Sequence, residues 1–172
     1  MIERGEKDSK KGQIKLSFGM IFSIILIAIF LAFAFFAIKK FLNISNTAQI
    51  AKFSDSIQDD IDRMWKGFQG EQEKEYILPG KIRYVCFADL SESARGINKK
   101  FYAGLNQIYY EKENMFFLPV GSAEGLDSKE VRHIDIKKIT EDENPFCLKS
   151  IKGKLKLTLK KEYGEALVTI TK

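Results

Sequence analysis

Residues 16–38 read LSFGMIFSIILIAIFLAFAFFAI, a run of 23 residues without a charged side chain. At about 1.5 Å per residue, a helix of this length measures about 35 Å, which is enough to cross a hydrocarbon core of about 30 Å. A buried helix of a soluble protein is the alternative, but the polar stripe usual in such a helix is absent from this run. A secretory signal has a shorter apolar core and a small-residue cleavage site after it. The run therefore predicts one membrane-spanning helix, with the lipid bilayer as the first expected partner.

Basic residues flank this run unevenly. Five precede it and three follow it closely: Arg4, Lys7, Lys10, Lys11 and Lys15 before, and Lys39, Lys40 and Lys52 after. The positive-inside rule then predicts a cytoplasmic N-terminus and an extracytoplasmic C-terminal domain in the cell membrane. From residue 41 onward there are 21 basic and 20 acidic residues, so the domain is nearly neutral. Because a broad basic surface is missing, nucleic acid is not an expected partner.

The chain beyond the span is long enough for one domain with its own core. Composition and periodicity divide the sequence into four parts. These are a basic N-terminal flank (1–15), a transmembrane helix (16–38), an amphipathic helical extension (39–70) and an extracytoplasmic α+β domain (71–172).

A stripe of apolar residues in the extension recurs at spacings of four, four, three, one and three. Its members are Phe53, Ile57, Ile61, Met64, Trp65 and Phe68. This spacing predicts one face of a helix, which we expect to dock on the domain. If the face is exposed in the monomer, it predicts instead a seam with a second copy or with another membrane or envelope protein. No proline interrupts residues 16–78, so span and extension form one helix, looser at residues 43–46 and ended by Gly67 and Gly70.

The rest of the domain predicts strands around one further helix. Leu155, Leu157 and Leu159 alternate with polar residues, and residues 165–172 follow a turn near Tyr163-Gly164, so this end predicts an antiparallel hairpin. The other expected segments are strands at 76–78 and 81–88 around a Pro79-Gly80 turn, a helix at 93–111, a strand at 115–120, a loop at 121–130 and a strand at 131–139. The predicted fold class is α+β, a long N-terminal helix packed on a small antiparallel sheet.

Residues that could carry chemistry are sparse. His133 is the single histidine, and on the expected strand it shares a face with Asp135. A zinc site from Cys86, Cys147 and His133 lacks paired ligand spacing. No glycine pattern resembles a phosphate-binding loop. We therefore expect no enzyme, no metal and no cofactor.

The two cysteines, Cys86 and Cys147, both lie in apolar segments, YVCFA and PFCLK. An even cysteine count outside the cytoplasm favours a disulfide between them. The alternative is two buried free thiols, which behave as small apolar side chains.

The four residues before the apolar run, Lys10-Lys11-Gly12-Gln13, resemble the class III signal of archaeal type IV pilin-like proteins. The resemblance implies cleavage between Gly12 and Gln13, a long helix that is apolar and then amphipathic, and a small antiparallel sheet after it. That family commonly carries a glutamate five residues into the mature chain, where it helps subunits to register. Here that position is Ser17.

Three functions follow as expectations. The first is a single-pass, non-catalytic, pilin-like structural subunit that acts through helix and domain contacts. The second is an anchored module that binds another envelope protein without forming filaments. The third is an extracytoplasmic enzyme, which would require a pocket where titratable groups converge.

Overall fold

The computed structural model describes residues 17–172, which divide between Phe41 and Leu42 into two units. Helix α1 (Phe18–Lys66) is the longest element. Ser17 caps its start, since the Ser17 hydroxyl accepts a hydrogen bond from the backbone N–H of Met20 at 3.3 Å. The helix continues through residues 43–46 without the looser turn that the sequence predicts. No proline or glycine lies between residues 20 and 66, so the backbone hydrogen bonds are not interrupted.

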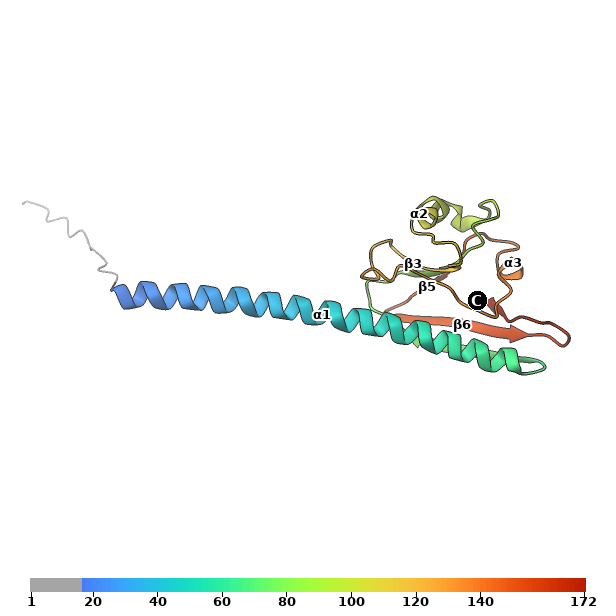
Figure 1. The fold of residues 1–172 in the computed structure, drawn as a ribbon, viewed down its shortest axis with the longest axis horizontal. Coiled ribbons are helices and arrows are strands. Elements are labelled where there is room, and N and C mark those ends of the chain that lie inside the picture. The colour runs from blue at the N-terminus through green and yellow to red at the C-terminus, as the bar shows by residue number, and fades with distance from the viewer. Residues whose placement is uncertain (1–16) are drawn as a thin grey trace, which may run out of the picture. The chain divides into compact units, whose positions relative to one another are not determined.

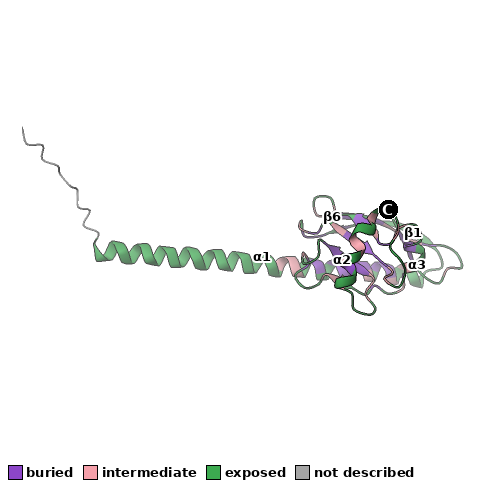
Figure 2. Cartoon of the chain, turned by 90° about the horizontal axis from the view of Figure 1, so that it is seen from above, coloured by how far each residue is buried: buried purple, intermediate pink, exposed green. Residues whose placement is uncertain are grey.

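The part of α1 in the first unit is apolar and exposed along its whole length (Figure 2). Within residues 17–172, α1 is the one helix long and apolar enough to cross a membrane, and its most apolar window has no buried residue. A continuous apolar surface of this size is costly in water. It is compatible with membrane anchoring.

The second unit contains two antiparallel sheets (Figure 1). The first has the strand order β1 (Gly70–Ile77), β6 (Lys154–Lys161), β7 (Thr169–Thr171). The second has the order β4 (Ser128–Lys129), β3 (Met115–Leu118), β2 (Tyr84–Phe87), β5 (Phe146–Lys149). Three short helical elements complete the described residues: η1 (Ile97–Phe101), α2 (Tyr102–Gln107) and α3 (Ile136–Ile139).

The terminal hairpin is confirmed. Leu155, Leu157 and Leu159 of β6 are buried, while Lys154 and Lys156 are exposed and Thr158 is half-buried, so the strand has one core face and one solvent face. Strand β7 pairs antiparallel with β6. The connection turns at Gly164, whose φ of 84° is a conformation that glycine adopts without steric cost.

The expected strands around Pro79-Gly80 belong to different sheets. β1 pairs with β6, and β2 pairs with β3 and β5, so this turn passes the chain from one sheet to the other instead of closing a hairpin. β1 also begins at Gly70, earlier than predicted. Its first residues are mostly charged and exposed, and an edge strand of this kind has no apolar alternation by which a sequence would reveal it.

Two other segments differ from prediction. The helix expected at 93–111 is confined to η1 and α2, because Gly96 takes a φ of 76° and passes within contact distance of Glu143. The strand expected at 131–139 is wrong. His133 has a φ of 63°, and the chain then forms α3, whose first turn is capped by the Asp135 carboxylate accepting the Lys138 N–H at 3.0 Å.

The main core lies between the docked part of α1 and the sheets. It joins the buried helix residues to the inward leucines of β6 and to residues of β2, β3, β5 and β7. A smaller cluster, on the other face of the second sheet, packs Cys86, Phe116 and Cys147 against Leu105 of α2. The α+β fold, a long N-terminal helix packed on small antiparallel sheets, is as the sequence predicts.

Candidate functional site

The docking face of α1 is formed by residues one turn apart. Ile50, Phe53, Ile57 and Ile61 are buried, and Met64 is partly buried against the same core. The Phe53 ring contacts the rings of Tyr76 at 5.3 Å and Phe117 at 5.7 Å, both edge to face. The sequence identifies four of these residues. It misses Ile50, although Ile50 precedes Phe53 by three positions and extends the same stripe.

Two residues assigned to this face do not enter the core. Phe68 is 87% exposed and lies beyond the last helical residue, Lys66, so helical spacing does not apply to it. Trp65 is 37% exposed, because one step along a helix rotates it by about 100° from Met64. Trp65 instead stacks on the His133 ring, with ring centroids 3.8 Å apart and planes 2° apart.

Trp65→Ala is therefore expected to lower the free energy of unfolding by about 1–2 kcal/mol, and not by the about 3–5 kcal/mol of a buried tryptophan. The loss comes from one stacked face and from part of the burial of the indole. Urea unfolding of the full chain in detergent measures it. A loss above about 3 kcal/mol would show that the indole belongs to the core.

The C-terminal end of α1 lies beside a buried lysine, Lys161. The ammonium of Lys161, the last residue of β6, donates to the carbonyl oxygens of Trp65 at 2.6 Å and Gly67 at 2.9 Å. A cation at a helix C-terminus satisfies free carbonyl groups and interacts favourably with the helix dipole. This contact fixes the end of α1 to the end of β6.

A buried carboxylate fixes the middle of the docked helix to β1. Asp60 accepts a hydrogen bond from the Tyr76 hydroxyl at 2.7 Å, lies 3.2 Å from the Lys74 ammonium, and forms an ion pair with Arg63. Burial raises the pKa of Asp60, but the hydrogen bonds from Tyr76, Lys74 and Arg63 outweigh it and hold that pKa below its ordinary value. Burial, and then the bond to Asp60, raises the pKa of Tyr76 far above its ordinary value.

The Asp60 cluster predicts a pH dependence. Because its pKa is lower in the folded state, ionised Asp60 stabilises the domain above about pH 4, and this contribution disappears as pH falls through the folded pKa. Asp60→Ala is expected to cost about 3 kcal/mol at pH 7, since it leaves the Tyr76 hydroxyl and the Lys74 charge without their acceptor. Urea unfolding at pH 7 and pH 3 should show a smaller difference between wild type and variant at pH 3. An equal difference at both values would contradict the assignment.

The cysteines are joined. A disulfide connects Cys86 on β2 and Cys147 on β5, which lie directly opposite each other with Cα atoms 4.0 Å apart. Both residues are buried. The bond spans 61 positions of sequence and links the middle of the domain to its terminal part.

His133 contacts a different carboxylate from the expected Asp135. Its Nδ1 lies 2.8 Å from Asp62 of α1, and this hydrogen bond is the main reason that the pKa of Asp62 is lowered. Gln58 donates to the same carboxylate at 2.7 Å and also bonds the backbone of Arg132. Asp62, Trp65 and His133 thus hold the 131–135 segment against the helix. We find a packing role for this histidine and no nucleophile beside it.

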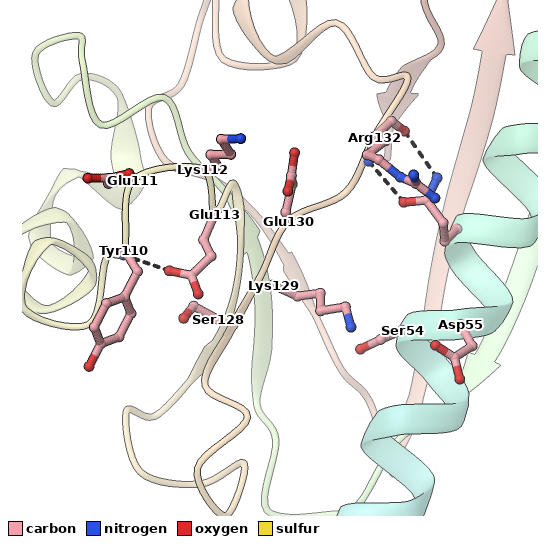
Figure 3. Close-up of a pocket in the computed structure, with 11 residues that line it drawn as sticks. Ser54, Asp55, Tyr110, Glu111, Lys112, Glu113, Ser128, Lys129, Glu130 and Arg132 are labelled. Atoms are coloured by element: carbon pink, nitrogen blue, oxygen red, sulfur yellow. Dashed lines mark hydrogen bonds between the residues drawn. The ribbon is translucent and has the colours of Figure 1, made fainter.

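Within the second unit, a groove lies between the docked part of α1 and the segments 110–113 and 128–132 (Figure 3). It has a volume of about 860 Å³ and opens to solvent, with Ser54 and Asp55 on the helix side and residues 110–113 and 128–132 opposite. Four acidic and three basic side chains line it in alternation: Asp55, Glu111, Glu113, Glu130, Lys112, Lys129 and Arg132. Mixed signs give no strong field for a charged ligand. The Ser128 hydroxyl donates a hydrogen bond to the Ile108 carbonyl at 3.2 Å.

The remaining expected sites are a metal site and the processing signal. Within residues 17–172, no group of three or more His, Cys, Asp or Glu side chains is arranged to hold a metal ion. Lys10, Lys11, Gly12 and Gln13 lie outside the described residues. Ser17 lies at the start of α1 as its cap, in the position where the resemblance implies a glutamate.

No protein-family model matches this chain, and neither a curated protein nor a solved structure matches it. Its function is therefore inferred from its own residues.

Proposed function

We propose that this chain is a single-pass, non-catalytic membrane protein of the pilin-like kind, whose extracytoplasmic domain acts through protein contacts. The observation that carries the proposal is the division of α1. Its first part is apolar and exposed, while its second part contributes Ile50, Phe53, Ile57 and Ile61 to the core of an antiparallel domain. One helix thus serves as membrane anchor and as the support of the domain.

Two further observations support an outward-facing domain. More basic residues precede the apolar run than follow it, which favours a cytoplasmic N-terminus. The Cys86–Cys147 disulfide is of the kind that persists in oxidising compartments and is rare in the cytoplasm. The charge distribution and the redox chemistry of the cysteines support this orientation independently of each other.

The second candidate is an anchored module that binds an envelope protein without forming filaments. Ser17 favours it, because the glutamate that helps pilin-like subunits to register is replaced by a neutral helix cap. The two candidates share the anchor and the orientation. They differ in processing and in assembly.

Intact mass of protein extracted from native membranes separates the candidates. The pilin-like proposal predicts a chain that begins at Gln13, and Gly12→Leu, which places a bulky side chain at the scissile bond, should leave the chain uncleaved. The protein should also be found in sheared surface filaments. A chain that still begins at Met1, in cells that process their own pilins, would refute the pilin-like part and leave the anchored module.

A further inference from the structure

The solvent face of the β1–β6 pair carries acids along one strand and lysines along the other. The register places four outward pairs side by side: Glu71 with Lys160, Glu73 with Thr158, Glu75 with Lys156, and Ile77 with Lys154. We use the name charge-paired face for its charged members, Glu71, Glu73, Glu75, Lys154, Lys156 and Lys160. It contains equal numbers of each sign.

Five of these side chains are exposed and Lys160 is half-buried, and together they form two rows. Lys154 pairs with Glu75 at 2.7 Å, and Lys156 lies 3.9 Å from both Glu73 and Glu75. The opposite face of β6 is the buried leucine row. The strand pleat therefore fixes the two rows about 5 Å apart on a regular surface.

We infer that two copies of this chain pair face to face through the charge-paired face. A two-fold axis parallel to the strands, between the rows, places every acid of one copy opposite a lysine row of the other. Glu71 then meets Lys160 of the second copy, and Glu75 meets its Lys156. An axis perpendicular to the strands would place acids on acids and lysines on lysines, which is repulsive. The charges thus select one orientation.

The orientation with the two-fold axis parallel to the strands is compatible with two chains anchored in the same membrane. β1 runs back along the docked part of α1, since the Cβ position of Gly70 lies 4.0 Å from Met64 and the Tyr76 ring lies 5.3 Å from Phe53. An axis parallel to the strands therefore leaves residues 42–66 of both copies pointing in the same direction. Two chains inserted in one bilayer with the same topology need this arrangement. The inference rests on the membrane-anchored part of the proposed function and is independent of the pilin-like part.

The chemistry of the face also favours a second anchored copy over a soluble partner. Exposed ion pairs are individually weak and are screened by salt. Confinement to one membrane raises the effective concentration of copies, so weak contacts suffice there. The pairing should accordingly weaken steeply as ionic strength rises.

Energy transfer between donor- and acceptor-labelled full chains in phosphatidylcholine vesicles, labelled at the C-terminus, tests the inference. Wild type should give transfer that falls at least threefold between about 0.05 M and 0.5 M salt. Two triple variants should abolish transfer. The first replaces the acids by lysine (Glu71→Lys, Glu73→Lys and Glu75→Lys), and the second replaces the lysines by glutamate (Lys154→Glu, Lys156→Glu and Lys160→Glu). Mixing these two triple variants should restore it, because an all-lysine face then meets an all-glutamate face.

A variant that combines all six substitutions keeps the ion pairs within each chain. It therefore controls for a loss of transfer caused by misfolding. This variant should pair with itself and fail to pair with wild type. Lys99→Glu with Lys100→Glu and Lys112→Glu, at exposed positions outside the face, changes the net charge as much as the lysine triple variant does. This control should leave transfer unchanged. The inference would be overturned if wild type gave no more energy transfer than the triple variants. It would also be overturned if mixing the two triple variants did not restore energy transfer. Vesicle flotation separates this result from failure of membrane anchoring, in which the chain would not float.

Discussion

Phe53→Ala is expected to lower the free energy of unfolding of the domain by about 3–5 kcal/mol. Phe53 is buried where α1 meets both sheets, and its ring contacts Tyr76 and Phe117. Truncation removes the apolar contacts and leaves a cavity among side chains that are already packed. Urea unfolding of the full chain in detergent, followed by far-UV circular dichroism, measures the loss.

Phe68→Ala is the matched control. It makes the same change 15 positions further along the chain, on a side chain that is 87% exposed. Its effect should stay within about 0.5 kcal/mol. If both variants lose equal stability, the docking of α1 through the 50–64 stripe is wrong.

Removing the disulfide is expected to cost about 4 kcal/mol in the chain-entropy relation, for a loop closed over 61 positions. This is a large part of the total stability of a domain of this size. Cys86→Ala with Cys147→Ala should therefore unfold at a clearly lower urea concentration than oxidised wild type.

Wild type treated with a reductant provides the comparison, since it keeps both side chains and loses the bond. It should move in the same direction as the double variant. An unchanged unfolding midpoint in the double variant would contradict the prediction. So would full alkylation of both thiols in native protein without reductant.

The elements that the sequence predicts well are those with a local apolar period. The leucines of β6 alternate at every second residue, and the docking stripe of α1 recurs at every third or fourth, so burial of each is readable from spacing. The cysteine pair is readable from its even count and apolar neighbours. In each case the physical reason is contained in a short window of sequence.

The errors arise where distant residues decide the local structure. The helix ends at Lys66, next to Gly67 as the sequence predicts, but the sequence does not reveal that Lys161, almost 100 positions away, bonds the carbonyl groups at this end. His133 reaches Asp62 and Trp65 across about 70 positions, which accompanies its left-handed backbone and replaces the expected strand. β1 has no apolar alternation over its first six residues and is defined by pairing with β6. The spacing of apolar residues within a short window of sequence cannot predict such long-range contacts.

The side of the membrane on which residues 42–172 lie is the most direct test of the central claim. Protease is added to intact cells that carry the chain with an N-terminal tag, and the fragments are detected at both ends. We predict that the domain is digested while the tag and the apolar run remain protected. Protection of the domain together with cleavage of the tag would show the opposite orientation and would contradict both the charge argument and the disulfide argument.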